Sequence, residues 1–177
     1  MTKELPTKGE QAFANLCSQL GYEAIKIERS PGQSKTPDFE VTANGLRVVA
    51  EVKDFDVNHE GREIEEKLRT ERMHIDEVDF SFDGGLERKL KKQAKQLAGE
   101  SNRGTATIAV IYSNRILGPT DHQVRHSLDR VSIPQEISAV VVIRNEDLQG
   151  MSPLWVLWRN PVANVPLDNE LFAEVRT

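Results

Sequence analysis

Three residues, Asp38, Glu51 and Lys53, are of the types that metal-assisted chemistry uses, and their spacing can bring them together. Hard divalent cations such as Mg²⁺ take oxygen ligands, typically one or two carboxylates completed by water and substrate phosphate. A lysine beside such a site can orient or help to deprotonate a water molecule, or stabilise the negative charge that develops on phosphate. If the fold gathers these side chains, they predict metal-assisted hydrolysis of a phosphodiester.

A β-hairpin is the element that must position these residues. Asn44-Gly45 separates two strand-like runs, and an Asn-Gly pair in that setting predicts a two-residue turn. Asp38 then lies opposite Glu51, and Lys53 points to the same face as Glu51 because side chains alternate along a strand. Opposed carboxylates destabilise a sheet unless a cation lies between them, so this register predicts a cation site. The alternative is a polar face that simply meets solvent.

Pro37-Asp38 followed by Glu51-Val52-Lys53 resembles the signature of the PD-(D/E)XK nuclease superfamily, which includes restriction endonucleases, archaeal Holliday-junction resolvases and repair nucleases. The resemblance implies an α/β fold with a central mixed β-sheet flanked by helices, and a restriction-endonuclease-like core in the order α-β-β-β-α-β. It also implies that Asp38 and Glu51 bind Mg²⁺ or Mn²⁺, with the backbone carbonyl of Val52 as a further ligand. In this interpretation Lys53 positions or activates the attacking water.

Two residues outside the hairpin match further positions of the superfamily. Glu10, on a helix predicted over residues 8–20, would bind the metal directly or through water. The alternative for Glu10 is a charge that the helix dipole favours in the first turn. Gln93, or else Gln96, would orient Lys53, the water or the phosphate. The long stretch between Lys53 and the Gln-bearing helix, and the lack of a Gln-x-x-x-Tyr variant, depart from the pattern and leave the subfamily open.

The helix predicted over residues 86–99 carries a basic outer stripe in an otherwise acidic chain. The net charge of −5 argues against a protein that coats nucleic acid nonspecifically. Most such stripes are solvated faces, whereas in the nuclease interpretation this one grips a nucleic-acid backbone. DNA is the expected partner, and RNA is the alternative. The stripe consists of Arg88, Lys91, Lys92 and Lys95.

The remaining pattern predicts a single nuclease-like domain over residues 1–177. A charged arm is inserted at about 56–84, either a solvated helix or mobile arm, or else a lid or dimer arm. The C-terminal part, about 137–177, is expected to hold strands and a short helix capped by Asp168. Many members of the superfamily act as dimers, since cutting two strands needs two sites, so the resemblance leaves a homodimer open. The other expected elements are strands over 23–29, 105–112, 137–143 and 154–158, and a helix over 121–130.

Composition favours a soluble cytoplasmic protein. The chain has 177 residues, 38% hydrophobic and 29% charged, enough for one sizeable core. No apolar run is long enough to span a membrane, and residues 1–6 lack the apolar segment of a secretory signal. Cys17 is the one cysteine and falls on the apolar stripe of the first predicted helix, so an inert buried thiol in a reducing compartment is expected.

Two functions follow from these observations. The first is a Mg²⁺-dependent endonuclease that hydrolyses DNA phosphodiester bonds at the site of Asp38, Glu51 and Lys53. The alternative is a noncatalytic module with a nuclease fold, which binds a protein or nucleic-acid partner. The acidic net charge favours the module. The intact set of two opposed carboxylates and a lysine favours the enzyme, because a module has no need to hold such carboxylates together.

Overall fold

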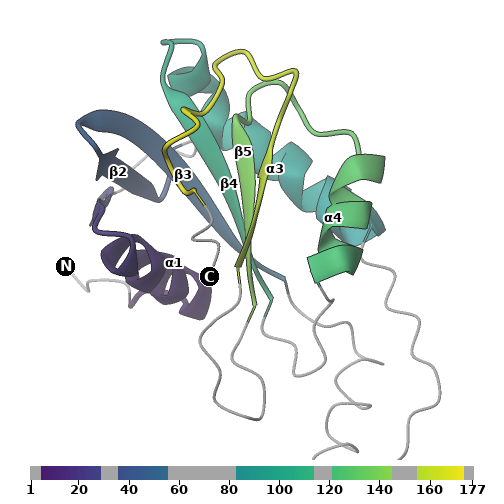
Figure 1. Ribbon diagram of the computed structural model, residues 1–177, viewed down its shortest axis with the longest axis horizontal. Helices are drawn as coiled ribbons and strands as arrows, with labels where there is room; N and C mark the ends of the chain where they lie inside the picture. The colour runs from purple at the N-terminus through teal and green to yellow at the C-terminus, as the bar shows by residue number, and fades with distance from the viewer. Residues whose placement is uncertain (1–4, 29–35, 56–82, 114–120, 145–154, 174–177) are drawn as a thin grey trace, which may run out of the picture.

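The computed structural model describes residues 5–28, 36–55, 83–113, 121–144 and 155–173. Six strands form one mixed sheet in the order β1-β2-β3-β4-β5-β6, with α1 on one face and α3 and α4 on the other (Figure 1). This arrangement confirms the predicted α/β class and the core order α-β-β-β-α-β. The elements are α1 (Lys8–Gln19), β1 (Glu23–Lys26), β2 (Phe39–Ala43), β3 (Leu46–Phe55), α3 (Asp83–Ser101), β4 (Ala106–Ser113), α4 (Asp121–Arg130), β5 (Ala139–Arg144) and β6 (Trp155–Arg159).

The hairpin of β2 and β3 has the predicted register. Asn44 and Gly45 have φ values of 51° and 77°, as a two-residue type I′ turn requires. Phe39 pairs with Ala50 and Ala43 pairs with Leu46, in antiparallel order. The turn chemistry and the period-2 pattern therefore specify the same alignment.

Beyond the hairpin the sheet becomes parallel. β3 pairs with β4, and β4 with β5, in parallel, whereas β1 and β6 close the two ends as antiparallel strands. The carboxyl ends of β3, β4 and β5 therefore lie at one edge of the sheet, the edge at which open α/β sheets commonly bind ligands. The strands β4 and β5 are buried almost throughout, as their apolar runs require.

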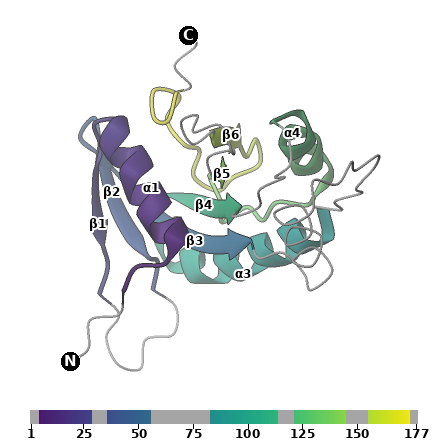
Figure 2. The ribbon, with the colours of Figure 1, turned by 90° about the horizontal axis from the view of Figure 1, so that it is seen from below.

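Each face of the sheet has its own apolar core. On one face, α1 packs Phe13, Leu16 and Cys17 onto the sheet, and the C-terminal turn adds Phe172. Figure 2 shows α1 lying across this face of the sheet. Burial raises the pKa of the Cys17 thiol to about 12, in accord with the inert buried cysteine that was predicted. The opposite core joins α3 and α4 to the sheet through Leu86, Leu90, Leu97, Val124 and Leu128. Among the described residues, no helix is long and apolar enough to cross a membrane.

The predicted C-terminal helix is absent from the described residues, which end at 173. Residues 169–172 form turns. The guanidinium of Arg159 donates hydrogen bonds to four backbone carbonyls, those of residues 167, 168, 169 and 171. The same carbonyls would have to accept i→i+4 bonds in a helix. The Asp168 side chain accepts from Glu170 N at 2.8 Å, which is a local turn rather than a helix cap. The turn ends at Phe172, which has a positive φ of 51°, stacks on Phe13 and donates its N–H to the Tyr22 hydroxyl.

Two further predicted boundaries change, at β1 and at α3. β1 ends at Lys26, three residues before the predicted end of the first strand. α3 begins at Asp83, so the last two residues assigned to the inserted arm belong to this helix. The rest of the arm, 56–82, lies outside the described residues.

Candidate metal centre

Asp38 and Glu51 come together where β2 begins and β3 nears its end. Both are buried, with 4% and 0% of their surface exposed. Asp38 Oδ2 accepts a hydrogen bond from Val52 N at 2.8 Å, which aims the Asp38 carboxylate across β3. The backbone does not keep the predicted pairing of position 38 with position 51, because Asp38 N donates to Ala50 O at 3.0 Å. The side chains nevertheless lie close enough to interact, since the charge of Asp38 contributes to raising the pKa of Glu51.

Glu51 is the member of the pair that the described residues leave incompletely satisfied. Burial, and then the charge of Asp38, raise the pKa of Glu51 to about 7, although the Lys53 ammonium acts in the opposite direction. Glu51 Oε2 is buried and finds no hydrogen-bond donor among the residues that the structure describes. A buried carboxylate oxygen without a donor is costly, and a shared proton or a cation would offset that cost.

Lys53 lies on the same face of β3 as Glu51, as predicted. Its Nζ donates to Glu51 Oε1. The Lys53 side chain is 32% exposed, so it is the member of the set that reaches solvent. The Lys53 ammonium therefore lies between the buried carboxylates and the solvent.

Gln93 contacts the strands rather than the lysine. Its side chain is fully buried, and Nε2 donates to Glu51 O at 2.7 Å and to Val110 O at 2.9 Å. The predicted role for Gln93 was to orient Lys53, water or phosphate, but these contacts fix β3 against β4 from the side of α3. Its Oε1 has no partner, and is the second buried oxygen at this site that lacks a donor. The alternative residue, Gln96, makes no contact with the carboxylate pair that the structure records.

Glu10 is not gathered with the carboxylate pair. It completes a capping box with Thr7 at the start of α1 and forms an ion pair with Lys26 at 2.7 Å. Among the described residues, no group of three or more His, Cys, Asp or Glu side chains is placed to hold a metal ion. These contacts favour the first-turn role over the ligand role. The sequence pattern Thr7-x-x-Glu10 is a capping-box motif, and it indicates this role of Glu10.

Asp54, which the sequence analysis did not single out, fixes α1 to the end of β3. Its Oδ1 accepts from Gly9 N at 3.1 Å. A Cβ on Gly9 would lie 2.1 Å from Asp54 Oδ1 and 2.9 Å from Tyr112 Cβ, so the close approach requires glycine. A glycine in the first turn of an amphipathic helix is a weak signal of such contact.

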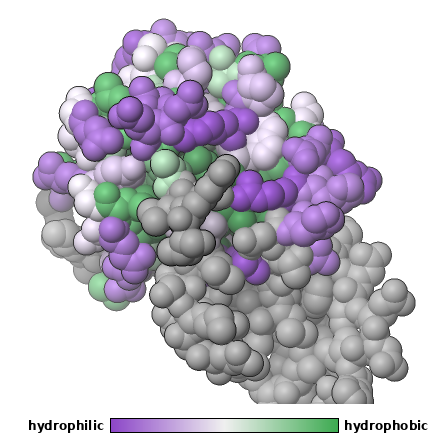
Figure 3. All heavy atoms as spheres, in the orientation of Figure 1, coloured by the Kyte–Doolittle hydropathy of each residue, from purple (hydrophilic) through white to green (hydrophobic). Residues whose placement is uncertain are grey.

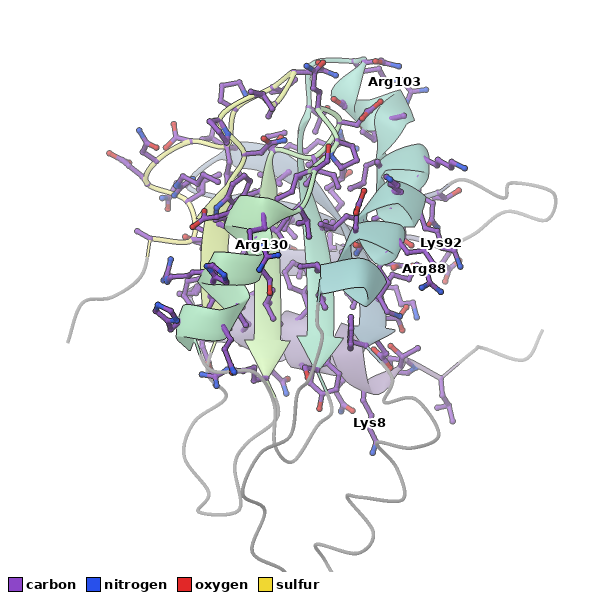
Figure 4. All side chains as sticks on the ribbon, turned by 90° about the vertical axis from the view of Figure 1, so that its right-hand side faces the viewer. Lys8, Arg88, Lys92, Arg103 and Arg130 are labelled. Carbon is purple, nitrogen blue, oxygen red and sulfur yellow. The ribbon has the colours of Figure 1, made fainter. Side chains whose placement is uncertain are left out.

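The basic stripe of α3 is exposed, as predicted. Arg88, Lys91, Lys92 and Lys95 all reach solvent, and Lys91 pairs with Glu87 at 2.6 Å. Figure 4 shows Arg88 and Lys92 projecting from α3 on the side away from α4. Hydrophilic side chains also gather at the right-hand edge of the molecule, over α4 (Figure 3).

Comparison with known proteins gives little further information. No family model matches the chain, and no curated protein matches it. A solved structure of SfsA from Pyrococcus furiosus in complex with Ca²⁺ is similar, with a TM-score of 0.34 and 14% sequence identity. The alignment covers 85% of this chain, which spans 59% of the SfsA chain.

Proposed function

We propose that this protein is a Mg²⁺-dependent nuclease that hydrolyses phosphodiester bonds, with DNA as its substrate and Asp38, Glu51 and Lys53 as its catalytic set. The observation that carries the proposal is the buried Asp38–Glu51 pair, in which Glu51 Oε2 has no donor. Membership of the PD-(D/E)XK superfamily is part of the same proposal, and rests on the motif and on the hairpin register that places it.

The residues present fit a hard divalent cation. Asp38 and Glu51 would hold it, together with the backbone carbonyl of Val52, and all of these supply oxygen ligands. Two carboxylates are enough for Mg²⁺, which usually keeps several waters and takes the rest of its shell from substrate phosphate. A third carboxylate from Glu10 is therefore not required. Mn²⁺ has the same ligand preference and should substitute.

Each residue then has a distinct task. When bound, Mg²⁺ lowers the pKa of water and offsets the negative charge on phosphate. Lys53 holds a proton at Nζ beside the site, where it can donate to the attacking water or to the phosphate oxygens. Gln93 acts as a positioning residue, because it holds the Glu51 carbonyl and the neighbouring strand in place.

The test is cleavage of supercoiled plasmid, of a branched DNA and of single-stranded DNA and RNA oligonucleotides, with Mg²⁺ or Mn²⁺. Wild type is compared with Lys53→Ala and Asp38→Asn. Cleavage by wild type that both substitutions abolish would support the proposal and begin to name the substrate. Cleavage that survives both would refute the assigned site.

The noncatalytic module predicts another result. It should cleave none of these substrates, and its melting temperature should not respond to Mg²⁺ or Mn²⁺. Since a ligand that binds only the native state raises the melting temperature, a clear rise without cleavage would show a real metal site whose substrate or partner is missing.

A further inference from the structure

Three cations on α3 have no partner in the part of the chain that the structure describes. Arg88, Lys92 and Lys95 are exposed, and none of them forms an ion pair or hydrogen bond with another described residue. Their neighbours differ, because Lys91 is paired with Glu87 and Lys89 donates to Asp54 O at 2.6 Å. Spacings of four and three residues place the three on one side of the helix. We call this row, Arg88, Lys92 and Lys95, the α3 ridge.

The α3 ridge begins level with the proposed catalytic set. Lys89 reaches the carbonyl of Asp54, the residue after Lys53, and Gln93 reaches the carbonyl of Glu51. Further along the helix, Glu100 pairs with Arg47 near the start of β3, at 2.9 Å. The helix therefore runs antiparallel to β3, and the ridge leads away from the level of Lys53 on the outer surface of α3.

We propose that the α3 ridge binds consecutive phosphates of one nucleic-acid strand, adjacent to the phosphate that is cut. The inference rests on the proposed function and adds to it how the strand lies. From Arg88 to Lys95 the helix rises about 10.5 Å at ~1.5 Å per residue. One strand of a duplex carries a phosphate every ~3.4 Å along its axis, so the ridge spans about three phosphates with three cations.

Charge complementarity identifies the occupant. The chain as a whole has a net charge of −5, so its surface repels a polyanion except where positively charged side chains are unpaired. An acidic protein would also be attracted to these cations, but it offers no regular row of single charges. A phosphodiester backbone does, and arginine and lysine are the usual side chains that contact it.

The test compares two double variants with equal charge. Arg88→Gln/Lys92→Gln removes two ridge cations. Arg125→Gln/Arg130→Gln removes two exposed arginines from α4, on another part of the same face of the sheet. Binding of a fluorescein-labelled 30-nucleotide single-stranded DNA is measured by anisotropy in EDTA, over a range of NaCl concentrations, with circular dichroism and melting temperature as checks of folding.

The expected results are quantitative. Each phosphate contact on a single strand contributes ~0.7 to the slope of log K against log salt, so the ridge variant should lose about 1.4 from that slope. At physiological salt this corresponds to about tenfold weaker binding, whereas the α4 variant should bind within about twofold of wild type.

Equal losses in the two variants, or no binding by wild type, would overturn the inference. Neither result depends on cleavage, because EDTA removes the metal. Metal-induced stabilisation and cleavage therefore still decide the proposed function on their own. If the wild type cleaves DNA but the ridge variant binds DNA as well as the wild type does, the proposed function stands and the inference about the α3 ridge is refuted.

Discussion

The carboxylates on the two faces of β3 differ in how the protein satisfies them. On the α1 face, Glu10 receives donors from Thr7 and Lys26, and Asp54 receives the N–H of Gly9. On the α3 face, Glu51 Oε2 has no donor and lies against a second carboxylate, Asp38. Carboxylates that hold the fold together are supplied with donors by the protein itself. One oxygen of the Asp38–Glu51 pair, Glu51 Oε2, lacks a donor among the described residues, and a buried polar atom of this kind is a candidate for binding a ligand.

The largest expected difference between the two faces is in catalysis. Asp38→Asn should reduce the rate of DNA cleavage by about 10²–10³-fold, the usual loss when one electrostatic stabiliser is removed from an active site. Glu10→Gln should leave the rate within about threefold of wild type, because its carboxylate serves the helix cap. The measurement is single-turnover cleavage in Mg²⁺. Equal losses for both variants would return Glu10 to the ligand set.

The second largest expected effect is on the pH dependence of stability, which should differ between the wild type and a variant without the Glu51 carboxylate. The folded pKa of Glu51, about 7, lies above its unfolded value, so its contribution to stability is fully present below about pH 4.5. That contribution is lost as the pH rises through about 7, by an amount on the order of 3 kcal/mol. Glu51→Gln should abolish this loss. Urea unfolding of both proteins in EDTA at pH 5 and pH 8 measures it, and parallel pH profiles would contradict the assignment.

Metal should reverse this loss of stability in the wild type. Because a cation and a proton compete for the same pair, Mg²⁺ should stabilise the protein more at pH 8 than at pH 5. The same titration of Glu51→Gln should show a much smaller shift in melting temperature. A shift of equal size in both proteins would place the metal elsewhere.

A smaller effect is expected where α1 meets β3. Gly9→Ala should destabilise the protein by about 2 kcal/mol, because the added Cβ has no room beside Asp54 and Tyr112. Gly99→Ala is the matched control, since no atom lies within 4 Å of its added Cβ, and it should stabilise α3 by about 0.5–1 kcal/mol. Urea denaturation measures both free energies. A neutral Gly9→Ala would mean that α1 can shift away from β3.

The smallest effect is expected at the helix cap. Thr7→Ala removes the side chain that accepts from Glu10 N at 3.2 Å, and should cost about 1 kcal/mol of unfolding free energy. Cleavage activity should be unchanged. A loss of activity larger than the loss of stability explains would connect the cap to the catalytic set.

The hairpin register could be predicted from the sequence because it depends on local chemistry. Asn44-Gly45 specifies the turn, and the alternation of apolar residues specifies the alignment, so Glu51 and Lys53 fall on one face as expected. The Asp38 backbone departs from that alignment just before the start of β2, where its N–H donates to Ala50 O and its carbonyl accepts from Ile27 N.

The contacts that were missed depend on distant segments. Gln93 binds carbonyls 42 and 17 residues away, on two strands whose parallel pairing cannot be counted along the chain. The C-terminal helix failed for a similar reason, since Arg159 on β6 takes the carbonyls that the helix needs. Glu10 is different, because the sequence pattern Thr7-x-x-Glu10 already indicates a capping box. The resemblance to the superfamily nevertheless favoured a role for Glu10 as a metal ligand.

The contact of Phe172 with Phe13 and Tyr22 has a consequence for synthesis on the ribosome. Tyr22 and Phe172 are 150 residues apart, so this part of the α1 core cannot close until residue 172 has emerged from the ribosome. Until then the nascent chain exposes the apolar side of α1 that Phe172 covers. Chaperone contact during translation should therefore persist until late, and a chain stopped before Phe172 should be an aggregation-prone product.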